Sequence, residues 1–328
     1  MSDPLGPVGF VLGGGGMLGA SEVGMLAALL DAGIRPDIIV GTSVGAINGA
    51  ALAADPTTSA IERLTDLWYE LGTSDVFDGG PARQLATVAK HGHLHANTTL
   101  RNRLRAELPA EIEDLPVTFQ CVAASIEYAR AHWFTRGPLV EAVLASCAVP
   151  ALLPPVKIGS EHFVDGGVVD SIPVGRAVEL GAQTVFVLHV GHIEKPLRPP
   201  RWPWEAGLVA FEIARRHGFS DALAKLPEEV RAHILPTGEN SGPAVAVRYR
   251  STTGVRRRIE RARVATAAYL ADAGLAAAEK PTERPTEKPA EKPTEKPTEK
   301  PTDAPAEKAA QNPDQSGTSG GGERTGAD

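Results

Sequence analysis

The 328-residue sequence has little cysteine, no excess of positive charge and no long apolar run, and each shortage excludes a class of protein. Two cysteines, Cys121 and Cys147, cannot form a disulfide framework or a cysteine-based zinc site. A net charge of −7 disfavours a nucleic-acid binder that relies on bulk positive charge. No segment approaches the roughly 18 apolar residues of a membrane span. Asp3 stands where a signal peptide would carry Lys or Arg, so we expect a cytoplasmic protein.

The composition changes near Ala278 and divides the chain into two predicted parts. From Glu279 onward a Glu-Lys-Pro-Thr tetrapeptide repeats and large apolar residues are lacking. Such a segment buries too little surface to offset its ordering entropy, and a proline at every fourth position blocks helix and sheet. We therefore predict a disordered tail over residues 279–328, acting as a spacer or, alternatively, docking to a partner. Residues 1–278 are predicted to form one domain.

Short apolar runs alternate with helical patterns through residues 1–278. The predicted strands are Val8–Leu12, Asp37–Val40, Thr118–Ser125 and Thr184–Val190, and the predicted helices are Ser21–Ala32, Ala46–Ala54, Leu139–Cys147 and Val174–Leu180. Strands that alternate with helices favour an α/β fold with a mostly parallel sheet.

A glycine-rich loop, Gly13 to Gly19, follows the first predicted strand and opens a helix. Backbone N–H groups at such a turn form a nest at the positive end of the helix, which can bind a phosphate or a developing oxyanion. A dinucleotide site would need an acidic residue at the end of the second strand, whereas Asp37 begins that strand. Nucleotide binding and a purely structural turn are the alternatives to an oxyanion site.

A serine lies in the pattern G-x-S-x-G at Gly41–Gly45, between a predicted strand and a predicted helix. Glycines flank such a nucleophile because neighbouring side chains would collide with the strand and helix at this sharp turn. The turn exposes the Ser43 hydroxyl at a helix N-terminus, where the local field favours an alkoxide. We interpret Ser43 as a nucleophile, with a helix-capping serine as the alternative.

The serine needs a proton acceptor, and the sequence offers a histidine or an aspartate. His189 follows an apolar strand and would complete a Ser-His-Asp arrangement. Two Asp-Gly-Gly triplets begin at Asp78 and Asp165. We favour Asp165 over Asp78, because its apolar flanks would partly bury the carboxylate and raise its pKa, which makes it a better base.

Four segments in one order resemble the patatin-like phospholipases. They are the glycine loop Gly14–Gly19, the elbow Gly41–Gly45, the Ala-Ser-x-Ala-x-Pro segment Ala145–Pro150 and the triplet Asp165–Gly167 with its continuation to Val174. The resemblance implies a three-layer α/β/α sandwich and a serine acyl hydrolase that acts on lipid esters without a cofactor or metal.

The resemblance also implies a Ser-Asp dyad of Ser43 and Asp165, without a histidine. The oxyanion would accept hydrogen bonds from the backbone N–H groups of Gly14, Gly15, Gly16 and Met17. Other glycines would allow the close approach of the motifs, and these are Gly19, Gly41, Gly45, Gly166 and Gly167. The family usually has Arg or Lys before the last glycine of the loop, where this chain has Leu18. We expect the loop to lack a fixed positive charge, which favours neutral esters as substrates.

Two further features resemble functional sites. His91, His93 and His95 alternate in a polar segment, which we interpret as a loop and not as a metal site. Cys147 is predicted to be a small buried residue.

Two segments are candidates for peripheral membrane contact. The first combines tryptophan with arginine and leads into an amphipathic stretch at Ala206–Arg216; it contains Arg198, Arg201, Trp202 and Trp204. For this segment we favour a proline-rich crossing whose tryptophans cover the core, with lipid contact as the alternative. The second is the basic segment Arg256–Arg263, which we expect to present a solvated face, with anionic lipid as a candidate partner.

Overall fold

The computed structural model describes residues 5–73, 98–150, 153–190, 196–238 and 254–276. Residue contacts divide the chain into two units, Met1–Ala278 and Glu279–Asp328, and every described residue belongs to the first. The predicted disorder and role of the tail therefore lie outside the described residues, and so do Asp78 and the three histidines at 91, 93 and 95.

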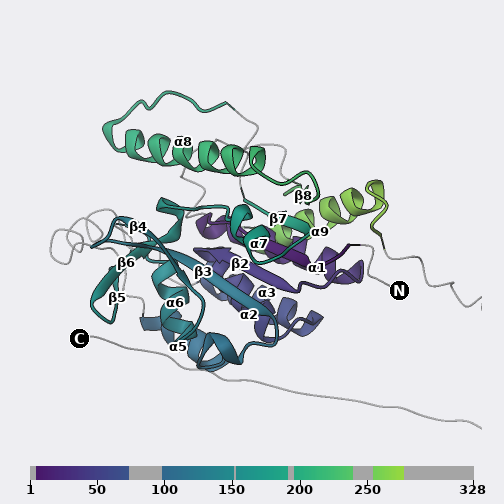
Figure 1. Ribbon diagram of the computed structural model, residues 1–328, viewed down its shortest axis with the longest axis horizontal. Helices are drawn as coiled ribbons and strands as arrows, with labels where there is room; N and C mark the ends of the chain where they lie inside the picture. Colours follow the sequence, from purple (N-terminus) through teal and green to yellow (C-terminus); the bar gives the residue numbers. More distant parts are fainter. Residues whose placement is uncertain (1–4, 74–97, 151–152, 191–195, 239–253, 277–328) are drawn as a thin grey trace, which may run out of the picture. The chain divides into compact units, whose positions relative to one another are not determined.

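A mixed sheet of eight strands forms the centre of the described unit (Figure 1). The strands are β1 (Val8–Leu12), β2 (Ile38–Thr42), β3 (Thr118–Ser125), β4 (Arg130–Phe134), β5 (Val156–Ile158), β6 (Glu161–Asp165), β7 (Thr184–Leu188) and β8 (Arg231–Ile234). Their order is β5-β6-β3-β2-β1-β7-β8, and β4 also pairs with β3. The run β3-β2-β1-β7-β8 is parallel, whereas β4, β5 and β6 form antiparallel pairs.

Helices cover both faces of this sheet. They are α1 (Ala20–Asp31), α2 (Val44–Ala54), α3 (Thr58–Thr73), α5 (Thr98–Glu107), α6 (Leu139–Ser146), α7 (Val174–Glu179), α8 (Pro203–Ala224) and α9 (Val255–Asp272). One core cluster contains residues of α1, α2, α3, α5, α6 and α9, and a second contains residues of α7 and α8. The predicted α/β/α sandwich is therefore confirmed.

Successive strand residues enter opposite cores because side chains alternate across a strand. Phe10 and Leu12 of β1 belong to the larger cluster, while Val11 between them belongs to the smaller one. In the same way Phe186 of β7 enters the larger cluster and Val187 the smaller. Strands buried on both faces are continuous apolar runs, which is why β1 and β7 could be predicted from the sequence.

Short connections place the carboxyl ends of β1 and β2 beside each other. Leu12 is in register with Gly41, and each strand leads directly into a turn and a helix. The glycine loop after β1 and the serine elbow after β2 therefore lie at the same edge of the sheet, which is where open α/β sheets bind ligands.

Asp37 lies at the opposite end of these strands. Its carboxylate accepts a hydrogen bond of 2.7 Å from the Val8 N–H, and its own N–H donates to the Val8 carbonyl at 2.9 Å. A dinucleotide site would need this aspartate near the glycine loop. Its position argues against the nucleotide-binding alternative.

Candidate active site

Ser43 is the residue between β2 and α2, and its backbone is strained. Its φ is 56° and its ψ −124°, a left-handed conformation that residues with a side chain rarely adopt. The two glycines of the motif allow the turn. A Cβ on Gly41 would lie 2.5 Å from the Gly45 carbonyl oxygen, and a Cβ on Gly45 would collide with the Leu12 carbonyl.

The C-terminal end of α6 holds the backbone of the strained serine in place. The Ser43 N–H donates to Ser146 Oγ at 2.9 Å, and the Ser43 carbonyl accepts from Cys147 Sγ at 2.9 Å. Burial raises the pKa of the Cys147 thiol, so it stays protonated and can donate. Cys147 is buried as predicted, but its contact with the elbow was missed, because nothing in the local pattern shows which residue α6 will touch.

Asp165 ends β6 and reaches Ser43 through the pairing of three strands. Thr42 on β2 is in register with Val122 on β3, and the next β3 residue, Ala123, is in register with Asp165. The Ser43 hydroxyl donates to Asp165 Oδ2 at 2.5 Å. The Gly167 N–H donates to Asp165 Oδ1 at 2.7 Å, which fixes the orientation of the carboxylate.

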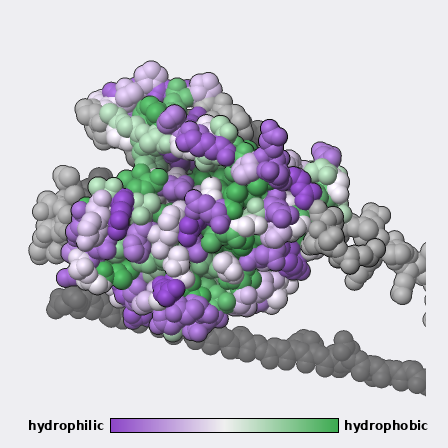
Figure 2. Space-filling view, in the orientation of Figure 1, coloured by the Kyte–Doolittle hydropathy of each residue, from purple (hydrophilic) through white to green (hydrophobic). Residues whose placement is uncertain are grey.

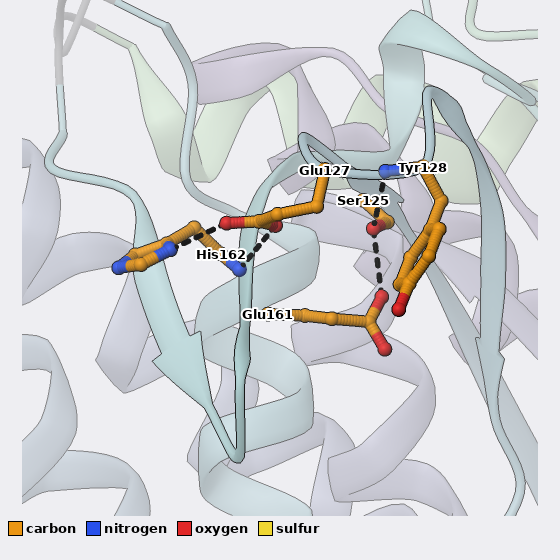
Figure 3. A network of polar contacts seen from close by, with 5 residues as sticks. All are labelled: Ser125, Glu127, Tyr128, Glu161 and His162. Carbon is orange, nitrogen blue, oxygen red and sulfur yellow. Dashed lines mark hydrogen bonds and ion pairs between the residues drawn. The ribbon is translucent and has the colours of Figure 1, made fainter.

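Polar contacts at the other end of β6 support this register (Figure 3). Ser125 Oγ donates to Glu161 Oε2 at 2.7 Å. The Glu127 carboxylate accepts from the His162 N–H at 2.8 Å and contacts His162 Nδ1 at 2.7 Å. These bonds tie the end of β3 to the start of β6. A one-residue slip, which would turn Asp165 to the other face of the sheet, would break them.

The dyad is buried: Ser43 is 4% exposed and Asp165 is 6% exposed. Burial raises the pKa of Asp165 from 3.8 to about 6, although the bonds from Ser43 and Gly167 favour the charged form. At pH 7 the carboxylate is therefore mostly ionised and more basic than an exposed aspartate. It can accept the proton of the hydroxyl that it contacts.

His189 does not make this contact. It follows β7, is buried, and its ring lies 6.4 Å from that of Phe219, measured between centroids. The hydrogen bond of the Ser43 hydroxyl runs to Asp165 instead. Of the two proton acceptors suggested within the described residues, the geometry favours the aspartate.

The hydrogen bonds of the glycine loop after β1 differ from the expected oxyanion site at one donor, Gly14. The Gly14 N–H donates to the Ser171 carbonyl at 2.9 Å, so this group is occupied and does not point to an oxyanion. Gly16 and Met17 lie in the first turn of the short helix η1 (Gly16–Gly19), where N–H groups have no partner within the helix. The expected donors are therefore reduced to Gly15, Gly16 and Met17.

The supporting glycines make close contacts around the dyad. A Cβ on Gly19 would lie 2.7 Å from Val44 Cγ2 of α2 and 2.9 Å from the Trp68 ring. A Cβ on Gly166 would collide with the Val122 carbonyl of β3. Both positions therefore require glycine so that the loop and the Asp165 turn can approach the elements that carry Ser43.

Arg258 of α9 overturns the expectation that the loop has no positive charge near it. Its Nη1 donates to the Met17 carbonyl at 3.1 Å, and the residue is only 8% exposed. The expectation of a solvated basic face is therefore wrong for Arg258. No local pattern could predict this contact, because 241 positions separate the two residues.

The chain is similar to known proteins over this region. A family model described as patatin-like phospholipase matches residues 10–178. The chain is 33% identical over 192 residues to lysophospholipase nte1 of Aspergillus terreus, covering 57% of this chain and 12% of that protein. It is 32% identical over 190 residues to the patatin-like phospholipase domain-containing protein ZK370.4 of Caenorhabditis elegans, covering 57% of this chain and 14% of that protein.

The chain thus matches only a small part of the length of these curated relatives. Among solved structures, it is similar to VipD from Legionella pneumophila, with 15% identity and a TM-score of 0.40 over 83% of this chain and 68% of that chain.

Replacing Asp165 with asparagine should stabilise the fold at neutral pH. The folded-state pKa of about 6 exceeds the ordinary 3.8, so the native state retains a proton that the unfolded state loses, and stability falls as pH rises between these values. Above pH 6 the ionised Asp165 carboxylate lowers the free energy of unfolding by about 3 kcal/mol, and Asp165→Asn removes this loss. Urea unfolding should show a gain of up to that size at pH 8 and almost none at pH 4. An equal gain at both pH values would contradict the burial effect.

Replacing Arg258 with methionine should loosen the glycine loop. The Met17 carbonyl would lose a charged donor, which costs about 2 kcal/mol at a buried site. We expect this loss in urea unfolding, together with roughly tenfold faster amide hydrogen exchange at residues 15–19. Arg263→Met is the matched control on the same helix: its exposed ion pair with Asp31 should contribute under about 1 kcal/mol. Equal effects of the two variants would show that Arg258 has no special role.

Proposed function

Because the chain belongs to the patatin-like phospholipase family, we propose that it is a serine acyl hydrolase that cleaves lipid esters with Ser43 and Asp165. The observation that carries this proposal is the 2.5 Å hydrogen bond between the two side chains. It joins a hydroxyl on a strained elbow to a buried carboxylate of raised pKa. A nucleophile in contact with a base that is itself oriented by a further bond is the arrangement that covalent catalysis requires.

In the first step, Ser43 Oγ attacks the ester carbonyl carbon while its proton passes to Asp165 Oδ2. The carbonyl π electrons move to oxygen and form a tetrahedral oxyanion. When the intermediate collapses, the bond to the alcohol breaks and the protonated Asp165 returns its proton to the leaving alkoxide. Ser43 is left as an acyl ester. The Gly167 N–H keeps the carboxylate oriented through both proton transfers.

The second step repeats the first with water as the nucleophile. Asp165 takes a proton from water, the hydroxide adds to the acyl carbonyl, and collapse releases a fatty acid and the Ser43 hydroxyl. The oxyanion of each step would accept hydrogen bonds from the N–H groups of Gly15, Gly16 and Met17. Removing one such donor costs on the order of 3 kcal/mol in comparable sites, so a firmly held loop matters. The contact from Arg258 to the Met17 carbonyl supports that role.

The relatives and the surroundings of the dyad support a proposal for the substrate class. The fungal relative is named a lysophospholipase, and we propose lysophospholipids or similar lipid esters for this chain. Val168 and Val169, which directly follow the Asp165 turn, are exposed apolar residues that suit an acyl chain. We further propose that the protein meets these lipids by peripheral contact with a membrane. Within the described ranges, none of the helices is long and apolar enough to cross one.

Ser43→Ala and Asp165→Asn should each lower p-nitrophenyl ester hydrolysis by roughly 10⁴-fold, because residues that act as a unit fail together. Thr184→Val is the matched control: it removes another buried hydroxyl, which donates to the Leu5 carbonyl, and should retain activity. A fluorophosphonate should label Ser43 in the wild type, as read by intact mass and peptide mapping.

The alternative base is tested by His189→Ala in the same assay, with circular dichroism to check that the variant is folded. If a folded His189→Ala protein loses turnover while Asp165→Asn keeps it, the proposed dyad is wrong and the histidine is the base.

A further inference from the structure

The outer face of α8 is apolar, although the helix is exposed to solvent. We define the α8 outer face as Ala206, Ala210, Ile213 and Ala214, which share one side of the helix and are all exposed. Ile213 is 55% exposed, and over these turns the face carries no charged side chain. Figure 1 shows α8 on one side of the domain, and in Figure 2 this region carries hydrophobic residues beside hydrophilic ones.

Over residues 206–216 the charges of this helix lie on its inner side instead, whereas Asp221, further along the helix, is exposed. Arg215 Nη2 donates to Glu212 Oε1 at 2.6 Å, and Arg216 Nε donates to the same oxygen at 3.0 Å. Glu212 is 4% exposed and Arg215 is 5% exposed. A surface helix normally turns its charges to water and its apolar residues inward. This arrangement is reversed over residues 206–216 of α8, which leaves an apolar face exposed there.

The residues that lead into α8 suit a lipid interface. Trp202 precedes the helix and is 57% exposed, so the expectation that it covers the core is wrong. Arg198 and Arg201 beside it are exposed. Glu205, in the first turn of α8, is directed at backbone, since it accepts from the N–H groups of Arg201 and Trp202. An interfacial tryptophan, two arginines and an apolar helix face match the charge and chemistry of an anionic bilayer surface.

The helix that carries this surface also adjoins the dyad. A Cβ on Gly167 would lie 3.2 Å from the Phe211 ring of α8, so this helix contacts the turn that orients Asp165. Phe211 is 38% exposed, and Val168 and Val169 on the same turn are exposed as well. The helix that carries the α8 outer face therefore also contacts the turn beside the Ser43–Asp165 pair.

We propose that the α8 outer face, with Arg198, Arg201 and Trp202, docks the protein on the surface of a bilayer that contains anionic lipid. This deepens the proposed function by naming the surface and the partner. Binding does not require hydrolysis, so the two proposals can be tested separately.

The test measures flotation of the full-length Ser43→Ala protein, which cannot consume the lipid by the proposed mechanism, with two kinds of vesicle. One contains phosphatidylcholine alone and the other contains phosphatidylcholine with one quarter phosphatidylglycerol. We expect clear binding to the anionic vesicles and at least about tenfold weaker binding to the neutral ones, because each arginine near an anionic surface contributes roughly fivefold. Arg198→Gln with Arg201→Gln should remove this difference.

Ile213→Glu, in the same background, should reduce partitioning to the anionic vesicles at least about tenfold, since one large apolar side chain would be replaced by a charge. The matched control is Val264→Glu on α9, where valine is 60% exposed. Neither position is buried, so both variants should fold, and the control should bind vesicles within about twofold of the parent. In an otherwise wild-type chain, Ile213→Glu should keep hydrolysis of a soluble p-nitrophenyl ester and lose hydrolysis of vesicle lipid.

Absence of vesicle binding, or equal loss of binding in Ile213→Glu and Val264→Glu, would overturn the docking proposal. A concentration-dependent dimer that Ile213→Glu dissociates, with no vesicle binding, would assign the face to a second copy of the chain and also overturn it. If vesicles bind as expected but the wild type hydrolyses no ester, the proposed function fails and the docking proposal stands.

Discussion

The hydrogen bond between Ser43 and Asp165 depends on β3, which pairs along one edge first with β2 and then with β6, while β4 pairs along its other edge. The two residues are 122 positions apart, and only this double pairing brings the ends of their strands together. The parallel pairing positions the elbow, while the antiparallel pairing turns the end of β6 toward it. Strand register is therefore the constraint on which the proposed chemistry depends.

Burial gives the site both its basicity and its instability. The same desolvation that raises the pKa of Asp165 disfavours its ionised form, so the native state carries a charged group that water would hold better. The Ser43 elbow adds backbone strain. Bonds from Ser146, Cys147 and Gly167 counteract these two effects, because each holds the backbone or the carboxylate in the required orientation.

Local patterns predicted the parts of this site that lie on single elements. The apolar runs of β1, β3 and β7 and the glycines around Ser43 are determined by neighbours in sequence, so the elements occur within a few residues of their predicted bounds. The choice of Asp165 rested on its apolar flanks, and the structure places that carboxylate on Ser43. The catalytic roles of both residues stay a prediction.

Contacts between distant elements were not predictable from the sequence. The bond from Gly14 to the Ser171 carbonyl depends on how the turn after β6 packs on the glycine loop. The approach of Arg258 depends on the packing of α9 against α1, where a Cβ on Gly24 would collide with the Ile259 carbonyl. Likewise, the helical pattern of α8 did not show which of its faces would lie inside.

The most direct test of the central claim is the pH dependence of fluorophosphonate labelling of Ser43. If Asp165 accepts the hydroxyl proton, the labelling rate should rise with pH along a single titration with a midpoint near 6, and Asp165→Asn should remove that titration. A rate that does not change between pH 5 and 8, or a titration that persists in Asp165→Asn and disappears in His189→Ala, would contradict the account.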